Sequence, residues 1–189
     1  MLNALFTGYL LAILSSWLKS SFDNYQLKNR SLLARSKCDH CGKKLKWFNL
    51  FPILSFLLQR GTSTCCKKKI SQNYLYIESS TFLIGCIFVF FEFSLSSILL
   101  IPFLVILVFL DEKYQEIPIW LNALILLIVS LSKKNLDPIM LLNAGMIFLG
   151  LIIIYWLYKF FRKREGLGLG DIILIFSLSL YLEIPTIFL

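Results

Sequence analysis

Residues 138–161 read PIMLLNAGMIFLGLIIIYWLYKFF. At about 1.5 Å per residue, a helix of this length crosses the roughly 30 Å hydrocarbon core of a bilayer. Further apolar runs recur along the chain, and six spanning segments are predicted: 2–18, 75–93, 96–111, 117–131, 138–161 and 171–189. A backbone in lipid must satisfy its own hydrogen bonds, so such runs favour helices over the alternating strands of a membrane barrel. The sequence predicts an all-α, polytopic membrane protein with about six transmembrane helices.

The composition of the 189-residue chain agrees with this prediction. Hydrophobic residues make up 58% and charged residues 16%, whereas a soluble domain is usually about half apolar and a quarter charged. This balance excludes an ordinary soluble enzyme, and the 17 phenylalanines exclude a disordered chain. The run 2–18 has no basic residue before it and no small-residue cleavage site after it, so we expect a retained helix and not a secretory signal.

Lysine and arginine predict which helix ends face the cytoplasm. Most of the 19 basic residues lie in the connection 19–73, and most of the others lie at Lys113 or within 159–164. The connections on the opposite side hold only Lys133 and Lys134. The positive-inside rule therefore places the three basic connections in the cytoplasm and the N-terminus outside. Topology and anionic lipid account for the net charge of +8, so the expected partner is the lipid bilayer and not a nucleic acid.

Most of the five cysteines lie in the predicted cytoplasmic connection. Cys38 and Cys41 are separated by two residues, which lets both sulfurs reach one tetrahedral Zn²⁺. Cys65 and Cys66 are adjacent, and adjacent side chains point apart in most backbones, so this second half of the candidate site is irregular. Four thiolate ligands would make the site structural, because no position would remain for a substrate.

Other assignments of these cysteines stay open. His40 or Ser63 is an alternative ligand, with serine the poorer of the two. In a reducing compartment, ordinary reduced thiols are a second interpretation, and a disulfide is a third. Cys86 lies inside a predicted helix and is expected to serve packing.

Two acidic residues are candidates for chemistry, because acids near a spanning helix are costly. Asp111 ends the third apolar run and Asp171 begins the last, and the predicted topology places both at the cytoplasmic face. His40 is the only histidine, so a Ser–His–Asp or Cys–His arrangement has no convincing base. Two carboxyl groups held close share a proton, so one activates a water while the other protonates a leaving amine, as in aspartic proteases.

Two glycines precede the second acid. Gly168 and Gly170 remove side chains beside Asp171, which would let an extended peptide approach the carboxylate. Each acid also has a structural interpretation: Asp171 could cap a helix N-terminus, and Asp111 could belong to a solvated helix end. The shared depth and side of the two acids favour a catalytic pair, with the glycines in substrate binding.

Taken together, these residues resemble the type IV prepilin leader peptidases, membrane aspartic proteases of the Gly-x-Gly-Asp kind. Pro118 follows Asp111 at the family's spacing, and the motif of the second catalytic aspartate is matched by Gly168, Gly170 and Asp171. Further matches lie in the cytoplasmic connection and at the start of the next helix: Cys38 and Cys41, Asn49-Leu50-Phe51-Pro52-Ile53-Leu54-Ser55, Arg60-Gly61, Tyr74 and Glu78.

The cysteines depart from the family pattern. Ser63 stands where the family has its third cysteine, Cys66 matches the fourth, and Cys65 is an extra neighbour. A structural zinc at Cys38, Cys41, Cys65 and Cys66 is therefore an expectation drawn from the residues and is not secured by the resemblance.

The resemblance implies that Asp111 and Asp171 cleave the basic leader from type IV prepilins or pseudopilins, at the cytoplasmic face of a bacterial cytoplasmic membrane. For many members it also implies methylation of the new N-terminus by S-adenosylmethionine. The expected organisation is a first transmembrane helix (1–18), a cytoplasmic basic and cysteine-containing loop (19–73) and a membrane peptidase domain with five helices (74–189). Family members usually continue beyond the second aspartate helix, so a short or truncated form is expected. The oligomeric state stays open.

Two other functions are alternatives. A truncated and catalytically inactive homologue could act in pilus assembly with both acids intact. A small ion or proton carrier could use the same acids as titrating sites, although carriers normally hold such acids near mid-bilayer and these lie at the edge.

Overall fold

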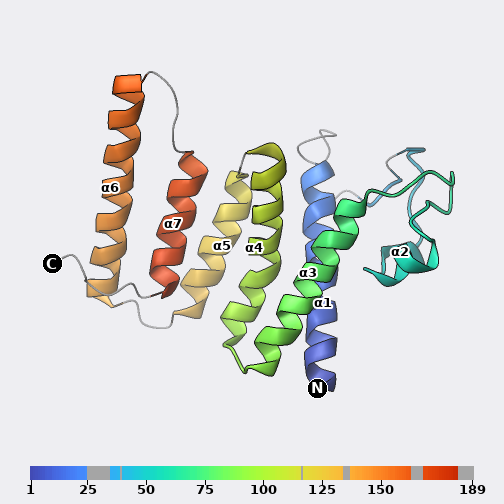
Figure 1. Cartoon of the computed structure of the whole chain (residues 1–189). Coiled ribbons are helices and arrows are strands. Elements are labelled where there is room, and N and C mark those ends of the chain that lie inside the picture. The colour runs from blue at the N-terminus through green and yellow to red at the C-terminus, as the bar shows by residue number, and fades with distance from the viewer. Residues whose placement is uncertain (25–34, 39, 116, 134–136, 163–167, 183–189) are drawn as a thin grey trace. The chain divides into compact units, whose positions relative to one another are not determined.

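The computed structural model describes residues 1–24, 35–38, 40–115, 117–133, 137–162 and 168–182 (Figure 1). They form these helices: α1 (Leu2–Phe22), the 3₁₀-helix η2 (Trp47–Leu50), α2 (Leu54–Leu58), α3 (Gln72–Phe90), α4 (Leu95–Tyr114), α5 (Ile119–Ser132), α6 (Pro138–Arg162) and α7 (Leu169–Leu182). Within the described ranges no strand occurs, and extended backbone pairs only in the isolated bridges Lys37–Lys44 and Thr62–Lys69. The predicted all-α class is confirmed.

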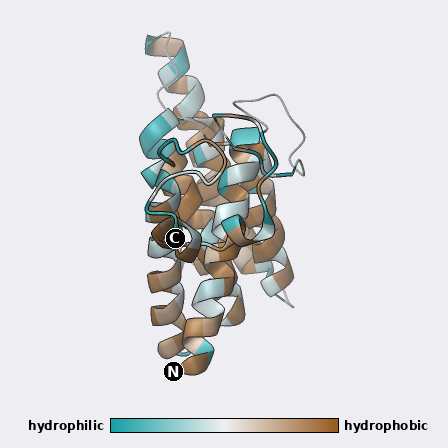
Figure 2. Cartoon of the chain, turned by 90° about the vertical axis from the view of Figure 1, so that its right-hand side faces the viewer, coloured by the Kyte–Doolittle hydropathy of each residue, from teal (hydrophilic) through white to brown (hydrophobic). Residues whose placement is uncertain are grey.

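The helices have the length and surface of a membrane protein. Three of them, α3, α4 and α6, are long and apolar enough to cross a membrane, and α5 and α7 are shorter apolar helices. On α6, Ile153 and Trp156 are 57% and 63% exposed, and Figure 2 shows hydrophobic residues along much of the length of the helices. Such surfaces are expected where helices face lipid. The chain is a polytopic membrane protein, as predicted, while the number of spans stays a prediction.

Helix ends differ from the predicted segment ends. The predicted segment 2–18 continues as helix, because Lys19 is only 3% exposed and forms a buried ion pair with Asp23 one turn later. The predicted segment ending at Asp111 also continues, to Tyr114. The last predicted segment, 171–189, begins inside α7 and then runs outside the described residues.

The chain folds into two compact units, Met1–Phe109 and Leu110–Leu189, and α4 contributes to both. In the first unit α1 and α3 pack along each other at small residues: a Cβ on Gly8 would lie 2.6 Å from the sulfur of Cys86. Cys86 is thus a packing residue, as expected. In the second unit α7 packs against both α5 and α6 (Figure 1). The predicted division at residues 18 and 73 follows membrane topology, which these units do not test.

Candidate functional site

Asp111 lies in the last turn of α4, within the second unit. The helix ends at Tyr114. The next residue, Gln115, has a left-handed backbone conformation (φ 54°) and donates its backbone N–H to the Asp111 carbonyl at 2.9 Å. The side chain of Asp111 is exposed. The first candidate acid therefore stands on a regular helical turn, directly before the chain leaves the helix.

Asp171 lies in the first turn of α7, which begins at Leu169. Its Oδ2 accepts the backbone N–H of Gly168 at 3.1 Å, so the carboxylate caps the helix N-terminus. Asp171 is half-buried, and no hydrogen bond from the described residues reaches its Oδ1. The capping interpretation is therefore correct for one oxygen, and the second oxygen is left for another partner.

The start of α5 packs against Gly170, the residue before Asp171. From the first turn of α5, Asn122 donates its Nδ2 to the Gly170 carbonyl at 2.9 Å. A Cβ on Gly170 would lie 3.0 Å from the Cβ of Ile117 and 3.1 Å from its carbonyl oxygen. The segment that follows the first acid, Asp111, therefore touches the turn that carries the second.

Gly168 has a different environment. A Cβ at this position would lie 3.0 Å from Oδ2 of Asp171, so glycine keeps that side of the carboxylate uncovered. The structure thus places Gly168 beside the acid, as expected, and Gly170 against α5. The role of the two glycines in binding a substrate stays a prediction.

The cysteine-bearing connection contains two similar turns. In the first, Cys38 donates its backbone N–H to the Lys43 carbonyl at 2.9 Å, and its own carbonyl accepts the N–H of Gly42 at 2.9 Å. Gly42 is left-handed (φ 68°), a conformation that glycine adopts without the steric penalty of a Cβ. This geometry brings Cys38 and Cys41 to the same side of the turn.

The second turn repeats the pattern with a serine in the first place. Ser63 donates its backbone N–H to the Lys68 carbonyl at 2.8 Å and accepts the N–H of Lys67 at 2.9 Å. Lys67 is left-handed (φ 59°), like the glycine of the first turn. Ser63 is therefore the structural counterpart of Cys38, and Cys66 is the counterpart of the second cysteine in the first turn.

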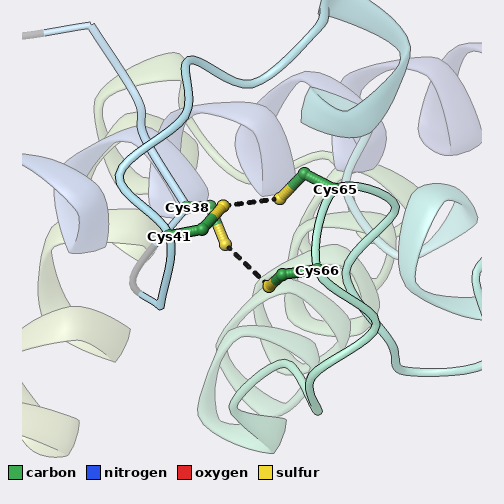
Figure 3. Close-up of side chains that lie close together, drawn as sticks. All are labelled: Cys38, Cys41, Cys65 and Cys66. Carbon is green, nitrogen blue, oxygen red and sulfur yellow. Dashed lines mark hydrogen bonds between the residues drawn. The ribbon is translucent and has the colours of Figure 1, made fainter.

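The four sulfurs form a compact cluster (Figure 3) in which all lie within 4.8 Å of one another. The sulfurs of Cys38 and Cys66 are 3.7 Å apart, and those of Cys41 and Cys65 are 3.1 Å apart. Tetrahedral zinc with Zn–S bonds of about 2.3 Å holds its sulfurs about 3.8 Å apart. The chemistry of these donors and the Cys38–Cys66 spacing fit one zinc ion, and the Cys41 and Cys65 sulfurs would move about 0.7 Å apart to bind it.

Cys65 supplies the sulfur that Ser63 lacks. Its sulfur lies 2.9 Å from the Ser63 Oγ, so both adjacent thiols reach the cluster in this tight turn, although adjacent side chains point apart in most backbones. The alternative ligand His40 instead places its Nε2 3.2 Å from the Lys69 carbonyl oxygen. All the cysteines are free thiols, so the disulfide interpretation is not realised in the structure.

Two family models together match most of the chain. The Bacterial Peptidase A24 N-terminal domain matches residues 10–93, which include the cysteine cluster. The Type IV leader peptidase family matches residues 98–189, which include both acids. The chain belongs to the type IV leader peptidase family. No solved structure matches it.

Several curated relatives of this leader peptidase family member carry the name Prepilin leader peptidase/N-methyltransferase. The protein of Dichelobacter nodosus is 30% identical over 154 residues, which cover 74% of this chain and 52% of that protein. The protein of Neisseria gonorrhoeae is 31% identical over 166 residues, covering 80% and 56%. The protein of Klebsiella pneumoniae is 29% identical over 160 residues, covering 78% and 68%. The chain spans about half the length of the first relatives it matches.

The thiols of this leader peptidase family member differ in acidity. Burial raises the pKa of the Cys38 thiol, but hydrogen bonds from the Ser63 hydroxyl and from the backbone N–H groups of Cys41 and His40 outweigh burial and lower the pKa to about 6. The hydrogen bond with the Cys65 thiol raises the pKa of Cys41 to about 11. The cluster therefore stabilises one thiolate, at Cys38, which its neighbours hydrogen-bond.

The segment between the two cysteine turns is anchored to the helices of the first unit. Glu78 of α3 is buried and accepts the backbone N–H of Ile53 at 2.7 Å. Tyr9 of α1 donates its hydroxyl to the Pro52 carbonyl at 3.4 Å. Ile53 is left-handed (φ 60°), which is unusual for a β-branched residue, so the buried carboxylate holds a strained turn. Glu78, which matches the leader peptidase family pattern, thus holds the residue directly after Pro52, which matches it as well.

Asn122 is a functional candidate that the sequence interpretation missed. It is 0% exposed, and its side chain bonds the residue before Asp171. The available signal was a polar side chain inside the apolar run 117–131, where burial of an amide is costly without a partner.

Proposed function

We propose that this chain is a prepilin peptidase, with Asp111 and Asp171 as its catalytic residues. The substrate is a type IV prepilin or pseudopilin, which loses its basic leader. The observation that carries the proposal is the contact between the Gly-x-Gly-Asp turn and the segment after Asp111, inside the region that matches the Type IV leader peptidase family. The names of the relatives support the substrate class.

In the proposed reaction the two carboxyl groups hold one proton between them. The ionised carboxylate removes a proton from a water, and the water oxygen attacks the carbonyl carbon of the scissile peptide. The protonated carboxyl then donates its proton to the leaving amine as the C–N bond breaks. The leader gains a carboxyl end, the pilin gains a new amino terminus, and the pair again holds one proton.

The two glycines have distinct proposed roles in this reaction. Gly168 keeps the space beside the Asp171 carboxylate open, and an extended leader backbone approaches there. Gly170 lets the turn lie close against Ile117, which brings the segment after the first acid to the second. Binding of the substrate and placement of the acids thus depend on neighbouring glycines.

We place the protein in the bacterial cytoplasmic membrane as a multi-pass protein with its N-terminus outside. The distribution of lysine and arginine supports this orientation. The helix 1–18 is then followed by the cytoplasmic loop 19–73 and the membrane peptidase domain 74–189. Both acids lie at the cytoplasmic edge, where a substrate with a basic leader and an apolar helix presents its cleavage site.

The names of the relatives also include N-methyltransferase. We propose that S-adenosylmethionine is the methyl donor for a second activity on the new amino terminus. Within the residues that the structure describes, no glycine-rich strand-to-helix turn offers a site for this donor. No residue of the chain is therefore assigned to the methylation step.

We propose a structural zinc ion at Cys38, Cys41, Cys65 and Cys66. Their compact spacing and soft sulfur donors support the assignment. Four protein ligands fill a tetrahedral site, so the ion would tie the two turns together and would take no part in cleavage.

Replacing Cys65 by serine is expected to remove zinc, whereas the double change Ser63→Cys with Cys65→Ser is expected to restore it. The Ser63 Oγ already lies 3.4 Å from the Cys38 sulfur, so a thiol at position 63 would reach the same ion. Metal analysis of purified protein should find one zinc per chain in the wild type and the double variant, and less than about a tenth of that in the single variant.

The packing thiol Cys86 provides the matched control for this series. Cys86→Ser lies outside the cluster and should keep its zinc. A wild-type protein without zinc, or a Cys65→Ser variant with a full complement, would contradict the proposed site.

Incubation of the detergent-purified chain with a prepilin tests the proposed function. Mass spectrometry of the new N-terminus reports cleavage, its position and any added methyl group. Cleavage directly before the apolar helix of the pilin is the expected result. No cleavage, combined with ion flux in liposomes, would favour a carrier, and the absence of both would favour an inactive homologue acting in pilus assembly.

A further inference from the structure

Asn122 links α5 to the turn that carries Asp171. Its Nδ2 donates to the Gly170 carbonyl at 2.9 Å, and this carbonyl belongs to the peptide unit whose N–H is that of Asp171. The hydrogen bond therefore holds the backbone immediately before the second acid. Ile117 also packs against Gly170: a Cβ there would lie 3.1 Å from the Ile117 carbonyl oxygen and 3.5 Å from Nδ2 of Asn122.

The second polar atom of Asn122 has no hydrogen-bond partner among the described residues. Its Oδ1 is buried, and no hydrogen bond from the described part of the chain reaches it. A buried acceptor without a partner costs free energy, which a leucine of similar size would avoid. Asn122 is therefore an unfavourable choice for packing alone, and its contact with Gly170 is the feature that explains an amide at this position.

The carboxylate of Asp171 depends on this turn for its direction. Its Oδ2 is held by the N–H of Gly168, and its backbone follows the peptide that Asn122 holds. A shift of this peptide would move the carboxylate relative to a bound substrate, and small displacements of catalytic groups have large effects on rate.

We propose that Asn122 is a positioning residue for leader cleavage, which acts on Asp171 through the Gly170 carbonyl. This inference rests on the proposed prepilin peptidase function. The role requires the N–H donor of the side chain. A group that can donate to the Gly170 carbonyl should therefore support catalysis, and a group of the same size that cannot donate should not.

Two variants separate this role from packing. Asn122→Leu keeps the size and removes the donor, so kcat should fall about tenfold to a hundredfold, with KM within about twofold of wild type. Asn122→Asp can donate to the Gly170 carbonyl only while its carboxyl is protonated. Its activity relative to wild type should therefore rise about tenfold as the pH is lowered from about 8 to about 5.

The surroundings favour this pH test. The carbonyl that Asn122 bonds belongs to the residue before Asp171, which is the titratable side chain of the first turn of α7, and α5 has no titratable side chain of its own. An aspartate at position 122 gains a donor only by taking up a proton, so lowering the pH is the direction that should restore the bond to the Gly170 carbonyl. Ser177→Ala is the matched control, because Ser177 is equally buried on α7 and, among the described residues, bonds the Ile173 carbonyl of its own helix. It should keep wild-type activity.

The experiment uses the full chain, purified in detergent, with one prepilin and with thermal melting of every variant. A wild type that does not cleave overturns the proposed function itself. If the wild type cleaves and Asn122→Leu has the same kcat, the positioning role is wrong. If Asn122→Leu melts at a lower temperature and the relative activity of Asn122→Asp does not change with pH, the residue is structural and the inference fails.

Discussion

Asparagine in place of Asp171 should abolish leader cleavage, with kcat/KM lower by about 10³-fold or more, and asparagine in place of Asp111 should do the same. Each change removes a group that transfers protons in the proposed reaction. The amide oxygen of the variant can still accept the N–H of Gly168, so the start of α7 should stay intact. Steady-state cleavage of a prepilin, together with the amount of each variant in the membrane, measures this effect.

Two acids outside the proposed pair serve as matched controls. Glu112 is exposed next to Asp111, and Asp137 precedes α6 on the predicted outer side. Glu112→Gln and Asp137→Asn should keep wild-type activity. Since two acids that act as one unit are not additive, the Asp111→Asn, Asp171→Asn double variant should be no slower than either single variant. Cleavage at the wild-type rate by Asp171→Asn would show that the pair is not catalytic.

A methyl group on Gly170 is expected to have the second largest effect, with a loss of activity of about 100-fold. The added Cβ would lie 3.0 Å from the Ile117 Cβ and 3.1 Å from a backbone carbonyl oxygen. Backbone cannot rotate away as a side chain can, so the turn before Asp171 must move. Cleavage assays on Gly170→Ala, at equal amounts of membrane protein, test this expectation.

Alanine substitutions at two other glycines serve as comparisons for the activity of Gly170→Ala. Gly168→Ala would place its Cβ 3.0 Å from a carboxylate oxygen of Asp171, which can rotate, so a smaller loss of activity is expected. At Gly145 of α6, no described residue beyond the adjacent helix backbone comes within 4 Å of the Cβ position, and Gly145→Ala should leave activity unchanged. Equal activity of all three variants would contradict the close packing of Gly170 against Ile117 and the start of α5.

The helices were predictable because lipid demands continuous apolar sequence. The predicted segment 138–161 and α6 (Pro138–Arg162) agree nearly residue for residue. Helix ends were less predictable, since hydropathy treats a charge as a break in the run. Lys19 remains in the helix because its charge is paired with Asp23 in a buried contact, and such pairing depends on neighbours that the local sequence does not describe.

The sequence indicates most of the candidate site residues, whereas it does not indicate their contacts. The spacing of Cys38 and Cys41 indicates a metal knuckle, but the approach of Cys65 to the cluster depends on the left-handed backbone of the second turn. The bond from Asn122 to Gly170 depends on α5 lying beside α7, and apolar runs carry no information on which helices are neighbours.

The central claim is that Asp111 and Asp171 meet at one site, and thiol cross-linking tests it most directly. With cysteine at both positions, a short bifunctional thiol reagent should yield one peptide pair joining 111 to 171 in a mass map. Once a chelator has removed zinc, the native sulfurs of Cys41 and Cys65, 3.1 Å apart, should cross-link in the same sample. Cysteines at 137 and 171 should not. A map that contains the Cys41–Cys65 link but no link between positions 111 and 171 would show that the two acids do not meet at one site.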